Sequence, residues 1–494
     1  MKILTSAIIK EWDAYTIANE PIASIDLMER AANAFCNQVL KANLIQGKSI
    51  IIICGLGNNG GDGLAIGRIL IEKGYEIKVH VIEYSQNKSE EFEKNLQKLN
   101  LVKPIQIIEN EASIPIFSDT DLVIDAIFGN GLNRSTDGIV KKVIQRINNS
   151  NCDIISVDIA SGLFSNSQNK PDDIIIKPSH TITFELPKLA FLLPQNQQFV
   201  GKWHAVSIGL SANFIEKVYS KYYYTNSAGN LIKRRPKFSN KGTHGHALLI
   251  VGSLGMMGAA ILSARACMRS GIGKLTVEFP KSERSIIQIT VPEALIKCID
   301  SDGFSLQLSY YEQYSAIGIG CGIGRQPETV AFLKWFLAHI NQPLVIDADA
   351  LNIIAENDFH HLIPKNSILT PHPKEFERLI GKNWLNDYEK LDLLLNFSVK
   401  HQVTIVLKGA HTAVALPNGT IHFNSTGNSG MAKAGTGDVL TGMITALLGQ
   451  NYNPADAAIL GVFEHGLAGD LAVIERSEYS ILAADIIENI RFKY

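Results

Sequence analysis

The chain has 494 residues, of which 46% are hydrophobic and 19% are charged, so two or three folded domains are predicted and a mainly disordered chain is excluded. The 48 acidic and 46 basic residues leave a net charge of −2, which gives no overall signature of nucleic-acid or membrane binding. The six cysteines stand singly without a C-x-x-C pair, as expected in a reducing cytosol. Charged Lys10, Glu11 and Asp13 interrupt the first apolar stretch, so no signal peptide is predicted and we expect a soluble, cytoplasmic protein.

The first part of the chain alternates between helical and strand patterns. Amphipathic segments at residues 6–20 and 24–42 predict two helices. The run SIIIIC, Ser49–Cys54, is apolar on both faces, as in a buried parallel strand. Further strands are predicted at residues 77–82, 122–124, 154–157 and 180–184. This alternation predicts a parallel sheet with helices on both of its faces.

Residues 214–242 are polar and lack sustained periodicity, so they predict a linker between domains at 1–215 and 225–494. The second domain repeats the α/β pattern and begins with a strand at 246–251. Its other strands are predicted at residues 274–279, 316–319, 344–346, 404–408 and 412–416. The uncharged run 247–264 is broken by three glycines, which favours a strand, a loop and a helix start over a membrane span.

A glycine-rich segment, GLGNNGGDG at residues 55–63, follows the first buried strand. Such a loop lets amide groups approach a ligand closely, and the helix behind it favours a phosphate. The spacing matches neither G-x-G-x-x-G nor a Walker motif, and a merely tight turn is the structural alternative. The polar side chains of Asn58, Asn59 and Asp62 favour a functional loop.

Two more predicted strands end in polar loops, at Asp125 in DAIFGNG and at Asp158 in DIASG. Because the carboxyl ends of parallel strands share one edge of a sheet, Asp62, Asp125 and Asp158 are expected to converge with Asn59 and Ser161. Oxygen ligands of this kind suit a hard cation or a polar ligand better than a transition metal.

Near the end of the second domain lies GMAKAGTGD at residues 430–438, before an apolar helix. Free amide groups at a helix start can stabilise a phosphoryl group, and Asp438 can take a proton from a substrate hydroxyl. A plain helix cap is the alternative role for Asp438. Upstream, KGAHT at 408–412 forms a second polar loop, DADALN at 347–352 ends another strand, and His372 lies between two prolines on a loop.

The motifs GLGNNGGDGLAIGRIL, DAIFGNGL and VDIASGL resemble those of NAD(P)H-hydrate epimerase domains, over most of residues 1–213. The resemblance implies a Rossmann-like three-layer sandwich that interconverts the R and S hydrates of NADH and NADPH. It implies that Asp158 is catalytic and that Asn59, Asp125 and Ser161 hold a potassium ion. The implied hydrate-binding residues are Asn58, Asn59, Gly60, Gly61, Asp62, Gly129, Asn130, Gly131, Leu132, Asn133, Arg134, Ser135 and Asp158. This chain has Asn130 where the family usually has Thr. It also has Ala160 in place of Pro, which loosens the loop that presents Ser161.

Seven motifs of the second domain resemble the ribokinase-like ADP- or ATP-dependent NAD(P)H-hydrate dehydratases, over nearly all of residues 225–494. They are KGTHGH, GSLGMMGAA, GCGIG, DADALN, TPHPKEF, LKGAHT and AGTGDVLTG. The resemblance implies catalysis by Asp438 and the use of magnesium with ADP or ATP. The implied hydrate-binding residues are Ala259, Gly322, His372 and Asp438. The implied nucleotide-binding residues are Lys408, Gly409, Ala410, His411, Thr412 and Gly437. Cys321 replaces the usual Pro and has no base near it in sequence, so a nucleophilic role is not expected.

Together these motifs predict a bifunctional enzyme that equilibrates the two hydrate epimers and then dehydrates the S form. Phosphorylation of the ring hydroxyl, with Asp438 as the base, converts hydroxide into a better leaving group. The sequence leaves open whether the donor is ADP or ATP and whether NADH or NADPH hydrate is preferred. The alternative is a small-molecule kinase fused to a non-catalytic nucleotide-binding domain. We expect a homo-oligomer with small-molecule substrates and no nucleic-acid or membrane partner.

Overall fold

The computed structural model describes residues 1–300 and 303–493, which form two compact units. The N-terminal unit comprises residues 2–220 and 386–388. The C-terminal unit comprises Met1 and the described residues of 221–385 and 389–494. Each unit contains its own sheet and its own hydrophobic core.

The sheet of the N-terminal unit is entirely parallel. From one edge to the other its strands are β4 (Gln106–Ile108), β3 (Ile77–Ile82), β2 (Ser49–Cys54), β5 (Asp121–Ala126), β6 (Asp153–Val157), β7 (His180–Phe184) and β8 (Lys202–Val206). The strands predicted from the sequence are all present, and the predicted parallel α/β fold is confirmed. The strands β4 and β8 at the two edges carry exposed positions and were not predicted.

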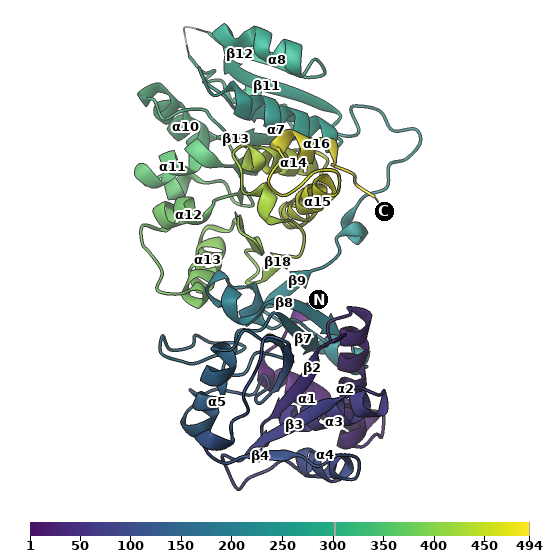
Figure 1. The fold of residues 1–494 in the computed structure, drawn as a ribbon. Helices are drawn as coiled ribbons and strands as arrows, with labels where there is room; N and C mark the ends of the chain where they lie inside the picture. Colours follow the sequence, from purple (N-terminus) through teal and green to yellow (C-terminus); the bar gives the residue numbers. More distant parts are fainter. Residues whose placement is uncertain (301–302, 494) are drawn as a thin grey trace. The chain divides into compact units, whose positions relative to one another are not determined.

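Helices cover both faces of this sheet (Figure 1). Residues of α2, α3 and α4 pack with Ile50, Ile52 and Cys54 of β2, whereas residues of α5 pack with Ile51 and Ile53. The strand is therefore apolar on both faces because each face meets a helical layer. The other elements of the unit are β1 (Lys2–Ile3), α1 (Ser6–Asn19), α2 (Ser24–Lys41), α3 (Asn58–Glu72), α4 (Glu90–Asn100), α5 (Gly138–Asn148) and α6 (Ala212–Lys217).

The glycine-rich segment differs from the predicted loop, because α3 already begins at Asn58. Its glycines permit very close packing. A Cβ atom added to Gly60 would lie 2.0 Å from the carbonyl oxygen of Gly55. One added to Gly63 would lie 2.5 Å from the Cβ of Ala126 and 2.8 Å from the Sγ of Cys54. Glycine therefore lets the first two turns of α3 pack directly on β2 and β5.

The sheet of the C-terminal unit is parallel except at β17, which runs antiparallel to both of its neighbours. From β9 to β12 its strand order is β9 (Tyr222–Thr225), β18 (Ile421–Asn424), β17 (Ala413–Ala415), β16 (Thr404–Leu407), β15 (Ile368–Leu369), β14 (Leu344–Ile346), β13 (Ala316–Ile319), β10 (His246–Ile250), β11 (Lys274–Pro280) and β12 (Leu295–Ile299). Within residues 214–242, expected to be a linker or a domain edge, residues 222–225 form the strand β9, which was not predicted. These residues pair with β18, far along the chain, so local sequence gives little sign of them.

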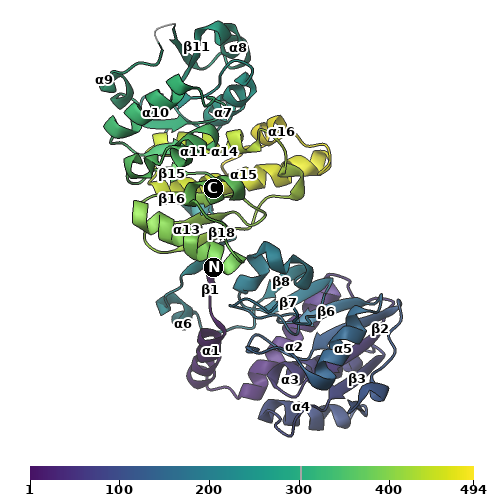
Figure 2. The same ribbon diagram turned by 90° about the vertical axis from the view of Figure 1, so that its left-hand side faces the viewer.

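Two helical layers enclose this second sheet. In Figure 1 the helices α7 (Met257–Arg269), α14 (Thr436–Gly449), α15 (Pro454–Glu475) and α16 (Ala483–Glu488) lie on one side of β13. Figure 2 is turned towards the helices of the opposite side, which are α10 (Pro327–His339), α11 (Ala348–Glu356), α12 (Pro373–Ile380) and α13 (Asp387–His401). The shorter α8 (Arg284–Thr290) and α9 (Leu308–Glu312) flank β12 along the chain.

The apolar stretches of this unit belong to its core. The run 247–264 forms β10, a loop and the start of α7, as predicted. Among the described residues, α15 is the one helix with the length and hydropathy of a membrane span, and 56% of the relevant window is buried inside the protein. Its residues pack with those of β14, β15 and β16, as is usual for a core helix.

Candidate active sites

A cavity of about 630 Å³ opens at the carboxyl ends of the strands in the N-terminal unit. Its walls come from the loops that follow β2, β5, β6 and β7, and from α1. This is the sheet edge where α/β proteins generally bind ligands. The residues predicted from the sequence that line it are Asn58, Asn59, Asp62, Gly129, Asn130, Gly131, Leu132 and Asp158.

Asp158 is held rigidly at this cavity. Its backbone has a φ of 65°, a left-handed conformation that is uncommon for residues other than glycine and is found at functional sites. Its carboxylate accepts hydrogen bonds from Thr183 Oγ1 at 3.1 Å and from the amide of Phe184 at 3.2 Å. The Nζ of Lys188 lies 2.7 Å away, and this lysine side chain is only 1% exposed. Asp158 thus carries a negative charge balanced by a buried cation, which no motif in the sequence indicated.

Asp13, Asp62 and Glu185 also line the cavity that holds Asp158, and two of these carboxyl groups have raised pKa values. Burial, followed by the charge of Asp158, raises the pKa of Asp13 to about 6, although Lys188 opposes this shift. Burial and the charges of Asp158 and Asp13 raise the pKa of Asp62 well above its ordinary value. The cavity therefore combines a charged carboxylate with carboxyl groups that accept a proton readily, an arrangement suited to acid–base chemistry.

Of the three residues predicted to bind potassium, Asn59 lines this cavity, whereas Asp125 and Ser161 are hydrogen-bonded to each other at the carboxyl ends of β5 and β6. The buried carboxylate of Asp125 accepts hydrogen bonds from the Ser161 hydroxyl at 2.5 Å and from the Ser161 amide at 2.9 Å. The Oγ of Ser161 also accepts a hydrogen bond from Phe128 N at 2.9 Å. Asn59 lies against Gly129, where an added Cβ would be 3.3 Å from the Asn59 Cβ. In the described parts of the chain, the buried Nδ2 of Asn59 has no hydrogen-bond partner.

The remaining predicted residues of this unit are more dispersed. Arg134 and Ser135 line a neighbouring cavity of about 650 Å³, which shares Gly57, Tyr84, Phe128 and Leu132 with the first. Gly60, Gly61 and Asn133 line neither of these two cavities. The two cavities therefore adjoin, and the predicted segment 129–135 runs from one into the other.

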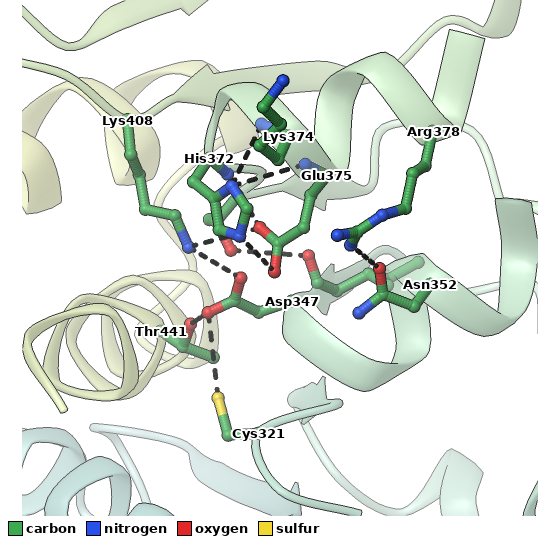
Figure 3. Close-up of polar contacts among 11 residues, drawn as sticks. Cys321, Asp347, Asn352, His372, Lys374, Glu375, Arg378, Lys408 and Thr441 are labelled. Carbon is green, nitrogen blue, oxygen red and sulfur yellow. Dashed lines mark hydrogen bonds and ion pairs between the residues drawn. The ribbon is translucent and has the colours of Figure 1, made fainter. Parts of the chain in front are cut away.

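In the C-terminal unit, polar side chains gather around Asp347, directly after β14 (Figure 3). Its Oδ1 lies 3.0 Å from Lys408 Nζ, and its Oδ2 accepts a hydrogen bond from Thr441 Oγ1 at 2.7 Å. Lys408 Nζ also lies 3.9 Å from an oxygen of Glu375. Burial tends to lower the pKa of Lys408, but the charges of Asp347 and Glu375 outweigh it and raise that pKa.

The N-terminus of α14 faces this cluster. Gly435 is the residue that precedes the helix, with a φ of 90°, so Asp438 lies in the first turn and does not occupy the capping position. A Cβ added to Gly437 would lie 3.4 Å from Lys408 Nζ. Burial raises the pKa of Asp438 to about 6. The hydrogen bond with Cys321 and the charge of Lys408 lower this pKa by smaller amounts, whereas the charge of Asp347 adds to the rise. The N-terminus of α14 therefore lies close to Lys408 and to the carboxyl group of Asp438. A helix N-terminus and a lysine can bind a phosphate, and the carboxylate can act as a base.

His372 is linked to Lys408 through Glu375. It is the residue that caps α12, where its Nδ1 accepts hydrogen bonds from the amides of Lys374 at 3.1 Å and Glu375 at 3.3 Å. Its Nε2 lies 3.4 Å from Glu375 Oε1 (Figure 3). Sequence analysis located His372 outside regular structure but assigned no role to Glu375, although Glu375 lies in the same motif, TPHPKEF.

Ala259 and Gly322 are neighbours. A Cβ added to Gly322 would lie 3.2 Å from the Ala259 Cβ. Cys321 is buried beside them, and burial together with the charges of Asp347 and Asp438 raises the pKa of its thiol well above the ordinary value. The thiol is therefore protonated and unsuited to act as a nucleophile.

The loop 408–412 is a tight turn between β16 and β17. Thr412 Oγ1 donates to the carbonyl of Gly409 at 3.0 Å, and His411 Nδ1 lies 3.0 Å from the carbonyl of Asn424. The turn is fixed next to Lys408, and its contact with a nucleotide stays a prediction.

Each of the two α/β units has acidic and basic side chains at the carboxyl edge of a mainly parallel sheet. This arrangement is typical of an enzyme with one active site in each unit. The family model described as NAD(P)H-hydrate dehydratase matches residues 247–491, and the model described as YjeF-related protein N-terminus matches 24–190. The chain is 32% identical to the bifunctional NAD(P)H-hydrate repair enzyme Nnr of Moorella thermoacetica, over 99% of this chain and 96% of that protein. It is 31% identical to the protein of the same name from Escherichia coli, over 94% and 88% of the two chains. The chain belongs to the family of bifunctional NAD(P)H-hydrate repair enzymes, and the predicted family and enzyme class are confirmed.

A solved structure of the ADP/ATP-dependent NAD(P)H-hydrate dehydratase from Bacillus subtilis, co-crystallized with ATP/Mg2+, is similar to part of this chain. It has 32% sequence identity, covers 54% of this chain and 96% of its own, and has a TM-score of 0.48.

Proposed function

We propose that the chain repairs hydrated NADH and NADPH in two steps, with epimerisation in the N-terminal unit and dehydration of the S epimer in the C-terminal unit. The observation that carries this proposal is the convergence of Asp438, Lys408 and Gly437 at the start of α14. A base beside a cationic anion site is what phosphorylation of a hydroxyl group requires.

Epimerisation needs a donor and an acceptor of protons around one ring carbon. In the hydrate, the carbon that carries the hydroxyl is bonded to the ring nitrogen, whose lone pair can expel hydroxide once that group is protonated. A protonated carboxyl, Asp62 or Asp13, supplies this proton, because the pKa values of both groups are raised. Asp158 stays charged beside Lys188 and takes a proton from the water molecule that returns on either face. Asp158 then passes this proton to the carboxylate that the acid left, which restores both groups.

We propose Asn59, Asp125 and Ser161 as the potassium site of this unit. The carboxylate and hydroxyl oxygens suit a hard cation, and the described structure gives buried Asp125 no ion pair with Lys or Arg. Burial raises the pKa of Asp125, so a cation there would supply the missing countercharge. Bound potassium would also tie the start of α3 to the loop after β5.

Dehydration follows from the groups around α14. Asp438 takes the proton of the ring hydroxyl, whose oxygen then attacks the terminal phosphorus of ADP or ATP bound with magnesium. The bond to the bridging oxygen breaks and AMP or ADP leaves. Lys408 and the amide groups at Gly435–Asp438 stabilise the charge on the transferred phosphoryl group. The ring nitrogen then expels phosphate, and loss of a proton from the neighbouring carbon restores the double bond of NADH or NADPH.

The test is incubation of the full chain with a mixture of R and S NADH hydrates and magnesium with ADP or ATP. We expect the absorbance of reduced nicotinamide to return fully, phosphate to be released and the remaining hydrate to keep an equilibrated epimer ratio. Accumulation of a phosphorylated product without the return of absorbance would instead favour the small-molecule kinase. Full consumption of the S epimer with R left unchanged would favour a non-catalytic N-terminal unit.

A cytosolic location is also proposed. All six cysteines are unpaired, and five of them are buried, which fits a reducing compartment. A homo-oligomeric state stays a prediction, which sedimentation velocity can test.

A further inference from the structure

A separate cavity of about 230 Å³ lies in the C-terminal unit at the carboxyl ends of β10, β11 and β12. It is lined by Ile250 and Glu278, which are paired in the register of β10 and β11, and by Ile299 of β12. Phe304 closes another side. Its ring stacks on that of Phe332 with a centroid distance of 4.0 Å and an interplanar angle of 9°, which fixes its orientation.

Glu278 is the unusual member of this cavity. Its side chain belongs to a residue that is 1% exposed, and its Oε2 atom has no hydrogen-bond partner in the part of the chain that the structure describes. A buried polar atom without a partner is costly, and native proteins rarely keep one without a reason. Burial raises the pKa of Glu278 to about 7, against the effect of Lys297. The carboxyl group is therefore present both as an acid and as a carboxylate near neutral pH.

The cavity adjoins the residues predicted to bind the hydrate. Ser253, which lines it, donates a hydrogen bond from Oγ to the carbonyl of Gly322 at 2.8 Å. Ile323, the next residue along the chain, also lines the cavity, and Gly322 contacts Ala259. A ligand at Gly322 can therefore extend along the same sheet edge into this cavity.

The shape and chemistry of the cavity restrict its occupant. Apolar side chains and a fixed phenylalanine ring favour a flat aromatic group, and the volume fits one ring system rather than a whole nucleotide. A carboxyl group accepts a hydrogen bond from an amino group and, when protonated, donates one to an adjacent ring nitrogen. Adenine presents that pair of groups along one edge.

We propose that this cavity binds the adenine ring of the dinucleotide hydrate, with the adenine amino group donating a hydrogen bond to Glu278. The proposal rests on the proposed function of the C-terminal unit and adds a specificity-determining residue to it. The hydrate spans from Asp438, where its nicotinamide ring reacts, past Gly322 to Glu278, where its other base is recognised.

The test compares the S hydrate of NADH with the S hydrate of its unsubstituted purine analogue, in which a hydrogen atom replaces the amino group. In the wild type we expect kcat/KM to be at least about tenfold higher for the adenine form, because the analogue has no amino group to donate a hydrogen bond to the carboxyl group. In Glu278→Leu we expect KM for the adenine form to rise about tenfold with kcat unchanged, and the preference to disappear. In Glu278→Gln, whose amide oxygen still accepts a hydrogen bond, part of the preference should remain.

Glu464→Leu is the matched control. Glu464 is 3% exposed, and burial raises its pKa to about 7, but it does not line this cavity. We expect its preference for adenine to equal that of the wild type. We also expect Glu278→Leu to unfold at the same temperature as the wild type or higher, since it removes an unpaired buried carboxyl group.

An unchanged preference in both Glu278 variants, or no preference in the wild type, would overturn the assignment of the adenine site. An equal loss with both substrates would show a structural role for Glu278 and would also overturn it. Failure of the wild type to dehydrate either hydrate would instead reject the proposed function itself.

Discussion

Lys408 and Asp347 form an ion pair of 3.0 Å between Nζ and Oδ1, at the point where β14 and β16 end next to α14. Asp347 is almost fully buried and also accepts a hydrogen bond from Thr441, so its carboxylate is fixed in place. The pair therefore holds the ammonium group of Lys408 beside Gly437 before any nucleotide arrives.

Replacing this lysine should affect both binding and stability. In Lys408→Ala we expect the binding free energy of the nucleotide to weaken by about 1.5–3 kcal/mol, the usual value of a hydrogen bond to a charged group. The uncompensated charge of Asp347 should lower the free energy of unfolding by about 3–5 kcal/mol. Calorimetric titration and denaturant unfolding measure the two effects. The double variant Lys408→Met with Asp347→Asn should recover stability but not nucleotide affinity. Recovery of both would show that Lys408 does not contact the phosphates.

Asp438→Asn keeps the size of the side chain and removes the base. We expect dehydration of the S hydrate to slow by about 10² to 10⁴, the usual contribution of general base catalysis, while nucleotide affinity is unchanged. Steady-state rates with the purified S epimer, together with calorimetric titration of the nucleotide, test this. Near-full turnover of the variant would mean that another group takes the proton.

The pH dependence of dehydration should follow the ionisation of Asp438. Its pKa is raised to about 6, and only the deprotonated form accepts a proton, so kcat/KM should fall about tenfold per pH unit below 6. The neighbouring groups Asp347, Lys408 and Cys321 change the pKa of Asp438 by less than burial does, so kcat/KM still falls as the pH is lowered. The rate profile between pH 5 and pH 8 should become nearly flat in Asp438→Asn. A profile of the same shape in that variant would contradict the assignment.

Asp158→Asn should separate the two activities. Asparagine tolerates the left-handed backbone of this position, so the loop should keep its path. We expect epimerisation to be lost while dehydration of the S hydrate continues, because the two sites belong to different sheets. The buried Lys188 loses its counterion, so thermal unfolding must accompany the assay. A folded variant that lacks both activities, or one that still epimerises at the wild-type rate, would refute the two-site mechanism.

Potassium should matter to epimerisation and not to dehydration. Replacing potassium chloride by choline chloride is expected to slow the exchange of R and S hydrates in the wild type. Asp125→Asn should be slow in both salts. Ser156→Ala is the matched control, because Ser156 also donates to Asp125, at 2.8 Å, but is not a predicted ligand. It should keep its response to potassium. Equal wild-type rates in both salts would reject the cation site.

The sequence predicted the central strands well because their burial leaves a strong local pattern, as in the four isoleucines of β2. It failed where long-range contacts decide the structure. The strand at Tyr222–Thr225 forms by pairing with β18, and α3 starts inside the glycine-rich segment because Gly60 can approach Gly55. The helix α3 would not be expected from its own sequence, since glycine lowers helix propensity. The strand β9 would not be expected either, since it forms by pairing with a distant strand.

The site residues follow the same division. Asp158 and Asp438 lie in recognisable motifs, and their catalytic roles stay predictions. Asp13 and Lys188 lie in no quoted motif, and only the fold brings Asp13 from α1 to Asp158. Glu375 lies in TPHPKEF, but the motif does not show that its side chain approaches Lys408. Their detection requires knowledge of which charged side chains become buried together.

The close approach of α3 to the sheet also bears on how this gene family can change over time. Any side chain at Gly60 or Gly63 would collide with the backbone or with the side chains of β2 and β5, whatever the ligand. Selection for a folded protein alone therefore preserves these glycines. A descendant that lost epimerisation would keep them, whereas Asn58 and Asp62 would be free to drift. Surveys of genomes for active epimerases should weigh the polar positions of the motif above its glycines.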